Sequence, residues 1–309
     1  HVSKAIIIIF LILTFYIGFI AYSDFSEFSS NISQFKFEFL PIILGLSFVS
    51  YFIMGIRQKI FLKRLGIKLK TKESLLLYFS GLSMSITPGG AGEAIKSYYL
   101  KKKYGHKISK TFPLVLIERF HDLGVVISVI AFTLIFLQIS EVIIVEIIII
   151  PLIIIAYVLV RIKKLFVKTI NFFNRIKKLE KIFGGILKSY DGMYEMLDPK
   201  TTIKAWAIGI IAQIFFALSV YSVFLAFDQD FGFIFTTQVV YSSILFGAIS
   251  LLPGGVGLTE ITTVNFLTDK GMEISLATSI TIMLRLVTIW FSTIMGLITT
   301  KIFLKEKNI

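Results

Sequence analysis

The chain has 309 residues, is 56% hydrophobic and has a mean hydropathy of +0.85, which excludes an ordinary soluble domain. It contains no cysteine, which excludes disulfides, thiolate metal sites and cysteine nucleophiles. The formal net charge is +13, but the basic residues are distributed as in a membrane protein rather than a nucleic-acid-binding protein. Stretches of about 20 apolar residues recur, so we predict an all-α integral membrane protein.

Basic residues concentrate in a few segments of the chain. Residues 57–72 hold seven, residues 96–110 hold six and residues 161–204 hold eleven of the 32. The other connections are acidic, and contain Asp24, Glu27, Glu38, Glu141, Glu146, Asp228, Asp230, Asp269 and Glu273. The positive-inside rule places the basic segments in the cytoplasm. This predicts a multi-pass protein of the cell membrane with both termini cytoplasmic.

The apolar stretches predict the membrane spans. Six full spans are expected, at residues 5–22, 39–61, 112–137, 141–160, 204–227 and 274–302. Between the fourth and the fifth, residues 161–203 alternate apolar and basic side chains at helical spacing, which predicts a basic amphipathic helix on the anionic cytoplasmic leaflet. We therefore expect residues 1–309 to form a single polytopic membrane domain.

Two copies of one rare motif interrupt the apolar sequence. Residues 87–93 read TPGGAGE and residues 252–260 read LPGGVGLTE. An arginine follows each copy at nearly equal distance, Arg119 at 31 residues from its proline and Arg285 at 32. Such a break is tolerated at membrane depth only where it is buried in protein or lines a polar cavity. Matched breaks in the two halves of a chain are typical of a transporter site at a repeat interface.

Each motif lies in a segment that must enter and leave the membrane on one side. Residues 73–95 connect two basic segments, and residues 233–267 connect two acidic ones. We therefore predict two re-entrant helical hairpins of opposite orientation, in an inverted repeat of residues 39–137 and 204–302. Their expected tips are Pro88, Gly89 and Gly90, and Pro253, Gly254 and Gly255. The alternative is that each segment forms two short spans or a surface helix.

Six ionisable side chains lie within apolar sequence, where they usually mark a pathway: Glu93, Glu118, Arg119, Asp122, Glu260 and Arg285. Glu118 and Asp122 are expected on one helix face, with Arg119 three residues before Asp122, so a self-neutralised cluster is the structural alternative to a substrate site. Arg285 has no acidic residue within one helical turn. Its partner must come from another helix, a hairpin or a ligand, and an anionic headgroup would suit it.

Glu93 and Glu260 each follow a glycine turn, where a helix would restart. Each carboxylate could simply complement the helix dipole. Alternatively, the helix start binds a phosphate while the carboxylate binds an ammonium group or carries a proton. His121 is interpreted as a packed core histidine rather than a proton relay. The three histidines lack metal-ligand spacing and no Walker-type loop occurs, so no metal or other cofactor is expected.

Four segments carry a family resemblance: TPGGAGEAIKSYYL, IERFHD, LPGGVGLTEITTVNFL and LRLVTIWFSTIMG. Over residues 5–303 the chain resembles the flippase-type transmembrane region of the lysylphosphatidylglycerol synthases, a family that includes stand-alone archaeal and bacterial membrane proteins. The family usually has arginine where this chain has Lys96, which weakens the transfer of a phosphate contact to the first motif. The resemblance implies movement of an aminoacylated or polyprenyl-linked lipid between leaflets. It does not include an aminoacyl-transfer domain, so synthase activity is not implied.

The resulting hypothesis is a lipid flippase or scramblase with a central cavity under the two hairpins. Arg119 and Arg285 would hold the phosphate. The two glutamates that follow the hairpin tips would gate the cavity or bind a cationic headgroup or a proton. Glu118 and Asp122 would tune Arg119 and relay protons.

Two other functions remain open at this stage. One is an integral-membrane transferase that uses Glu118 or Asp122 as a base on a lipid-linked substrate, although no catalytic motif is found and an enzyme is not expected. The other is an accessory subunit that docks a glycosyltransferase at the membrane. The expected partners are lipids with anionic or zwitterionic headgroups and a lipid-modifying synthase or glycosyltransferase, without nucleic acid.

Overall fold

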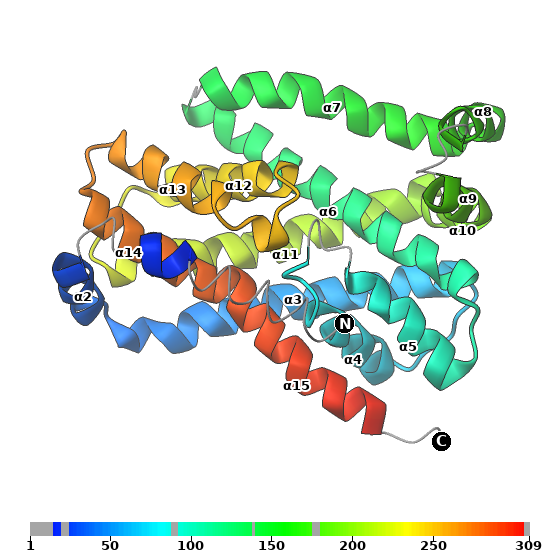
Figure 1. The fold of residues 1–309 in the computed structure, drawn as a ribbon, viewed down its shortest axis with the longest axis horizontal. Helices are drawn as coiled ribbons and strands as arrows, with labels where there is room; N and C mark the ends of the chain where they lie inside the picture. Colours follow the sequence, from blue (N-terminus) through cyan, green and yellow to red (C-terminus); the bar gives the residue numbers. More distant parts are fainter. Residues whose placement is uncertain (1–14, 20–24, 88–91, 138–139, 175–179, 306–309) are drawn as a thin grey trace.

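The computed structural model describes residues 15–19, 25–87, 92–137, 140–174 and 180–305, and within these residues it is all-α and contains no strand (Figure 1). The helices are α2 (Phe25–Gln34), α3 (Leu40–Arg64), α4 (Thr71–Leu82), α5 (Ile95–Tyr104), α6 (Ile108–Leu137), α7 (Ser140–Arg161), α8 (Lys163–Asn174), α9 (Glu180–Lys188), α10 (Tyr190–Met196), α11 (Pro199–Ala226), α12 (Phe233–Ile249), α13 (Leu258–Thr268), α14 (Ile274–Arg285) and α15 (Phe291–Lys305).

Four helical segments among the described residues are long and apolar enough to cross a membrane: Phe37–Arg64, Ile108–Leu137, Pro199–Ala226 and Ile274–Lys305. They match four of the six predicted spans, and the chain is a multi-pass membrane protein. The predicted span 141–160 lies within α7, whose residues Ile147–Arg161 form a shorter apolar helix. Most of the predicted span 5–22 lies outside the described residues. The part of it that is described, residues 15–19, is helical.

Helix ends follow local sequence signals. Pro199 occupies the first turn of α11, where its missing N–H costs no hydrogen bond, and the Asp198 carboxylate accepts from the Thr201 N–H at 3.2 Å. This bond lowers the pKa of Asp198. In the last long segment, α14 and α15 are joined by a π-helical turn, Leu286–Trp290, directly after Arg285. Such turns occur frequently at functional sites.

Both predicted hairpin segments have a helix, a break and a second helix. In the first hairpin, α4 is followed by turn residues 83–87 and by a 3₁₀ turn at residues 92–94 before α5. Its predicted tip, Pro88, Gly89 and Gly90, lies outside the described residues. In the second hairpin, α12 and α13 flank a 3₁₀ turn at Pro253–Gly255. The predicted break in the second hairpin is therefore present.

The two halves pack in corresponding ways. Helix α4 of the first hairpin contacts α3 of its own half and α15 of the other half. Helix α12 of the second hairpin contacts α11 of its own half and α6 of the other half. The two remaining long helices, α3 and α11, pack against each other (Figure 1). These reciprocal contacts relate the two halves, and both the inverted repeat and the re-entrant course through a membrane remain predictions.

Helices α8, α9 and α10 occupy the basic segment after α7 and lie together at one end of the molecule, whereas α2 lies at the other end (Figure 1). An ion pair joins elements at each end, Arg64 to Asp198 at 3.0 Å and Lys36 to Asp228 at 2.5 Å. The basic connections thus lie at the end of the molecule that holds α8, α9 and α10 (Figure 1). That this end faces the cytoplasm remains a prediction.

Two of the three apolar clusters among the described residues lie on either side of a polar zone on α6. On α6, Leu114 and Ile117 belong to one cluster and Ile130 and Leu134 to the other. Residues 118–122, with three of the predicted site residues, fall between. Helix α6 therefore places these three charged groups between two apolar clusters, away from both of its ends.

Candidate functional site

A cavity of about 450 Å³ lies where the two hairpins approach each other. The first half contributes Glu93, Arg119 and Asp122 to its wall, and the second half contributes Gly254 and Arg285. The rest of the wall is largely apolar and includes Leu123, Val126, Phe216, Ile244, Leu245 and Ile289. One cavity therefore borders both copies of the motif.

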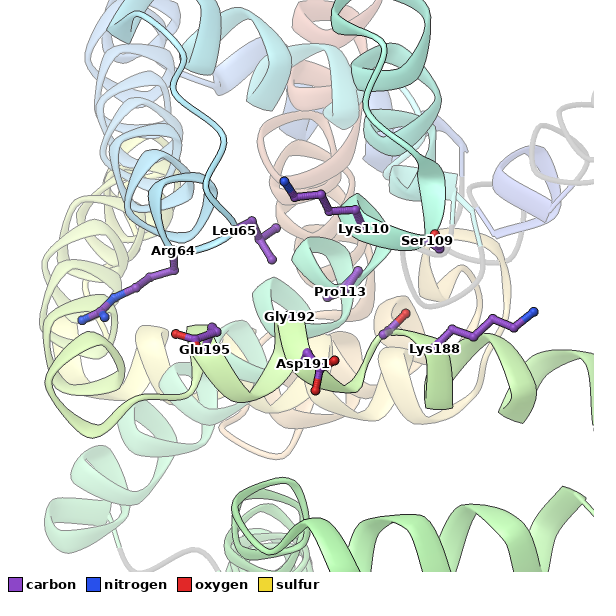
Figure 2. Close-up of a pocket in the computed structure, with 10 residues that line it drawn as sticks. Arg64, Leu65, Ser109, Lys110, Pro113, Lys188, Asp191, Gly192 and Glu195 are labelled. Atoms are coloured by element: carbon purple, nitrogen blue, oxygen red, sulfur yellow. The ribbon is translucent and has the colours of Figure 1, made fainter.

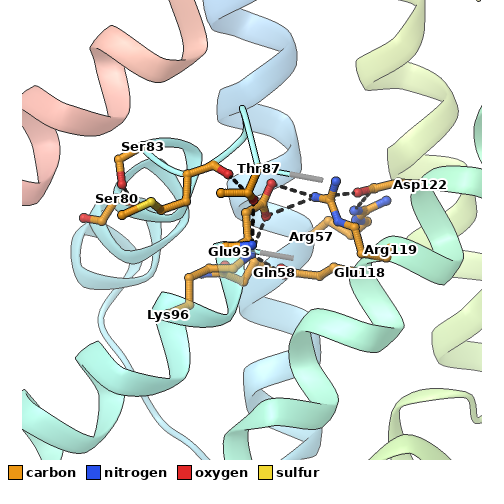
Figure 3. A network of polar contacts seen from close by, with 12 residues as sticks. Arg57, Gln58, Ser80, Ser83, Thr87, Glu93, Lys96, Glu118, Arg119 and Asp122 are labelled. Carbon is orange, nitrogen blue, oxygen red and sulfur yellow. Dashed lines mark hydrogen bonds and ion pairs between the residues drawn. The ribbon is translucent and has the colours of Figure 1, made fainter. Parts of the chain in front are cut away.

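The first ion cluster consists of six charged side chains, shown in Figure 3: Arg57, Glu93, Lys96, Glu118, Arg119 and Asp122. Three are acids and three are bases, so the formal charges cancel. Pairing is essential because each unpaired charge in a water-poor interior costs several kcal/mol. The self-neutralised cluster considered from the sequence is thus present, but it is larger than expected.

A reciprocal pair of contacts joins the first hairpin to α6. Two neighbouring residues of α6 pair with two residues of the hairpin: Glu118 with Lys96, and Arg119 with Glu93 (Figure 3). The Arg119 Nη2 donates to both Glu93 oxygens at 3.0 Å, and the Lys96 Nζ lies 3.1 Å from Glu93 Oε2. Lys96 also donates to Glu118. Two residues of opposite charge on each side therefore fix the register between hairpin and helix.

Asp122 connects this cluster to α3 and to the cavity. Its carboxylate accepts from Arg57 and pairs with Arg119 at 3.0 Å. The side chains of Arg119 and Asp122 are 39% and 19% exposed, whereas the other four members are at most 2% exposed. The most exposed charges of the first ion cluster are thus the Arg119 guanidinium and the Asp122 carboxylate.

The second ion cluster consists of Glu260, Arg285 and Tyr16. The Arg285 Nε lies 2.7 Å from Glu260 Oε1, and Tyr16 from the helical residues 15–19 donates its hydroxyl to the same oxygen at 2.8 Å. Arg285 also donates through Nη2 to the carbonyl of Gly254 at 2.5 Å. The partner that Arg285 requires therefore comes from the second hairpin.

Glu260 has the first of the roles considered from the sequence, and its binding of a headgroup or a proton remains a prediction. Its Oε2 accepts from the backbone N–H of Gly257 at 2.7 Å, so the carboxylate stabilises the start of α13. Its Oε1 binds Arg285 and Tyr16. Glu93 differs, because it lies in the 3₁₀ turn before α5 and both of its oxygens pair with cations.

The six predicted site residues all belong to these two clusters. Glu93, Arg119, Asp122 and Arg285 line the cavity, whereas Glu118 and Glu260 lie behind its wall and bind bases. Of the predicted tips, Gly254 and Gly255 line the cavity and belong to the 3₁₀ turn that begins at Pro253.

Sequence reasoning misplaced Arg57 and Lys96, which it assigned to basic cytoplasmic loops. Both are buried and paired with acids inside the molecule, because each lies at the edge of a basic segment but still within a packed helix. The spacing of Lys96 three residues after Glu93 could have identified it. Tyr16 was missed as well, and an isolated tyrosine in an apolar stretch gives no sequence signal.

His121 is buried and its Nδ1 lies 2.8 Å from the carbonyl oxygen of Ile117. Its ring contacts those of Phe61 and Trp206. These contacts fit the interpretation as a packed core histidine. Among the described residues, no group of three histidine, aspartate or glutamate side chains is placed to hold a metal ion.

A second hollow, of about 360 Å³, lies at the end of the molecule where the basic connections gather (Figure 2). Arg64, Lys110 and Lys188 line it together with Asp191 and Glu195 of α10. Its charges are mixed and it borders neither motif. It is therefore separate from the cavity between the hairpins.

Comparison with known proteins identifies relatives along the whole chain. Residues 5–296 match the family model described as the lysylphosphatidylglycerol synthase TM region. A UPF0104 membrane protein of Pyrococcus horikoshii is 26% identical over 293 residues, covering 84% of this chain and 85% of the relative. A UPF0104 membrane protein of Methanocaldococcus jannaschii is 24% identical, covering 99% of this chain and 96% of the relative. The chain therefore belongs to the lysylphosphatidylglycerol synthase TM region family.

Proposed function

We propose that the protein is a flippase or scramblase that moves a phosphate-containing lipid between leaflets. The observation that carries this proposal is one cavity lined by two arginines, Arg119 and Arg285, each paired with a glutamate of a different hairpin. Matched intramembrane breaks at a repeat interface are typical of transporters, in which the two repeats move against each other around one central site. Family membership supports a membrane role of this kind.

The wall of the cavity suits an amphipathic ligand. Arg119 offers a half-exposed guanidinium for a phosphate, and Asp122 offers a carboxylate for an amino group beside it. The apolar side chains of Phe216, Ile244 and Leu245 can contact the first carbons of the acyl chains. A headgroup fits a volume of about 450 Å³, while the chains would extend between helices into the bilayer.

In this proposal each site residue has a role. Arg119 and Arg285 bind the phosphate, and the acids paired with them, Glu93 and Glu260, gate the two hairpins. Asp122 tunes Arg119 directly, and Glu118 tunes it through Lys96 and Glu93. The ligands would be aminoacylated phospholipids or polyprenyl-phosphate-linked lipids, supplied or used by a lipid-modifying synthase or glycosyltransferase.

The alternative of an integral-membrane transferase has weaker support. A general base needs a carboxylate free to accept a proton from the substrate. Glu118 is buried against Lys96, and Asp122 is engaged by both Arg57 and Arg119. An accessory role for a glycosyltransferase would not require the second ion cluster.

The test is lipid movement by purified protein in liposomes with fluorescent lipid analogues. Arg285→Ala should abolish transport while the protein stays folded and monodisperse, and Arg285→Lys should restore only part of the rate because lysine lacks the planar fork that binds phosphate with two hydrogen bonds. Arg64→Ala is the matched control, since Arg64 forms a half-exposed ion pair away from the cavity.

Normal transport by Arg285→Ala would contradict phosphate binding at this residue. An unfolded Arg285→Ala protein would instead assign Arg285 to a structural ion pair. The same assay on the unmodified chain tests the proposed function directly, because a purified protein that moves no lipid analogue is not a flippase or scramblase for that lipid.

A further inference from the structure

Tyr16 connects the second ion cluster to a part of the chain outside both proposed repeats. Its hydroxyl donates to Glu260 Oε1 at 2.8 Å and accepts from Arg285 Nε at 3.3 Å. Because Arg285 Nε also lies 2.7 Å from Glu260, the three side chains form a closed triangle. The phenol thus contacts both members of the ion pair and fixes their relative position.

Few charges hold the second hairpin compared with the first. Among the described residues, Glu93 is paired with two cations, whereas Glu260 is paired only with Arg285 and also contacts the Tyr16 hydroxyl and the Gly257 N–H. Loss of one cation therefore leaves Glu260 without any positive partner among the described residues. An anion that competes with Glu260 for Arg285 would therefore weaken the contacts that hold the second hairpin.

The backbone at the tip of the second hairpin is suited to movement. Gly254, Gly255 and Gly257 have positive φ values of 60, 65 and 96 degrees, and Leu251 has a φ of 54 degrees. A leucine in this region is strained because its Cβ crowds the following carbonyl oxygen. Strained residues persist where surrounding contacts hold them and are frequent in segments that switch.

Arg285 makes bonds that a phosphate group would replace. Its Nε pairs with Glu260 Oε1 at 2.7 Å and its Nη2 donates to the Gly254 carbonyl, and both partners belong to the second hairpin. A phosphate can accept two hydrogen bonds from one guanidinium. Binding of phosphate at Arg285 would therefore remove both direct contacts between this residue and the hairpin.

We propose that Tyr16, Glu260 and Arg285 form a latch that keeps the second hairpin closed, and that a phosphate group in the cavity opens it by binding Arg285. Tyr16 is a positioning residue that stabilises the closed pair. The inference rests on the proposed function, because it takes the phosphate of the transported lipid as the ligand that opens the latch.

The absence of cysteine allows a direct test of opening. Thr288 lines the cavity one turn after Arg285, and its Oγ1 is buried without a hydrogen-bond partner among the described residues, so Thr288→Cys removes no bond. The rate at which a small neutral thiol reagent labels this cysteine in detergent then reports opening. Tyr16→Phe should raise that rate about tenfold, the effect of one hydrogen bond to a charged group.

Tyr221→Phe is the matched control, because it removes a tyrosine–carboxylate bond of the same 2.8 Å length, to Asp230, outside the cavity. It should leave the labelling rate unchanged. If Tyr16→Phe does not fold, Glu260→Gln weakens the same latch from the other side and should also raise the rate. Equal labelling of the parent and of the folded latch variant would overturn the latch.

The ligand is tested with three additions to the Thr288→Cys protein: a short-chain phospholipid, a diacylglycerol with the same chains, and inorganic phosphate. The phospholipid should raise the labelling rate, and the diacylglycerol should not. An increase with inorganic phosphate as well would make the phosphate group sufficient, and an increase with phospholipid alone would make the lipid the ligand. No increase with either phosphate source contradicts the proposed opening.

The latch and the proposed function fail in different ways. Faster labelling in Tyr16→Phe together with no lipid movement in liposomes would retain the latch and reject the flippase. Lipid movement together with unchanged labelling in Tyr16→Phe would retain the flippase and reject the latch.

Discussion

The hairpin of α4 and α5 and the hairpin of α12 and α13 carry matched motifs but are held in different ways. Three acids and three bases surround the contact between the first hairpin and α6. One ion pair, one tyrosine and one backbone carbonyl hold the second hairpin at Arg285. Two hairpins with the same motif are therefore held by different numbers of charged contacts. We expect the first hairpin to stay fixed and the second to move.

We expect the two hairpins to enter the membrane from opposite faces, and cysteine labelling tests this. The single-cysteine variants Lys68→Cys and Lys107→Cys should react only with a thiol reagent supplied on the cytoplasmic side. The variant Gln229→Cys should react only with reagent supplied on the outer side. The chain has no other cysteine to interfere. Labelling of residue 107 from outside would mean that residues 73–95 cross the membrane, and the inverted repeat would be wrong.

The largest expected loss of stability follows from removing Lys96. Lys96→Met leaves Glu118 without its cation and leaves Glu93 paired with Arg119. The side chains of Lys96, Glu118 and Glu93 are each at most 2% exposed. Breaking a buried pair from one side costs about 3–5 kcal/mol. Unfolding in detergent measures this loss, and Lys63→Met at an exposed position of α3 is the control.

The double variant Lys96→Met, Glu118→Gln separates charge from packing. It removes one charge of each sign, so most of the lost stability should return. A double variant as unstable as Lys96→Met would show that shape, rather than charge balance, holds the first hairpin. In the second cluster Glu260 and Arg285 are the only charged members among the described residues, so removal of either one leaves the other unpaired.

Close backbone contact should also fix the first hairpin. A Cβ on Gly296 of α15 would lie 2.1 Å from the backbone nitrogen of Ser83, directly after α4. Gly296→Ala should therefore destabilise the protein by about 1–3 kcal/mol, as overpacking does. At the control Gly45→Ala, no described atom lies within 4 Å of the new Cβ, and no loss is expected. A neutral Gly296→Ala would mean that the first hairpin can move away from α15.

Sequence reasoning could predict the parts of the site that depend on local signals. The repeated Pro-Gly-Gly motif predicts two helix breaks, and charges within apolar sequence identify six members of the two ion clusters. Arg57 and Lys96 were missed because counting basic residues by segment cannot tell a loop residue from a buried residue within a helix. Tyr16 contacts Glu260 across 244 residues, and such a contact depends on tertiary packing alone.

The smallest expected effect, and the only gain, is at the tip of the second hairpin. Leu251 has a φ of 54 degrees and its side chain is 69% exposed, so Leu251→Gly should relieve strain while losing little packing within the protein. The left-handed conformation costs a non-glycine residue about 1–2 kcal/mol, part of which is offset by the greater freedom of glycine in the unfolded chain. We expect a net gain of about 0.5–1 kcal/mol in detergent unfolding.

The neighbouring residue is the control, since Leu252 has an ordinary φ of −74 degrees and is 48% exposed. Leu252→Gly should lose stability, because glycine adds unfolded-state freedom there without relieving strain. Opposite signs at adjacent leucines would confirm that the second hairpin is strained when closed. A loss at both positions would mean that its tip is relaxed, and the difference between the two hairpins would then lie in their ion clusters alone.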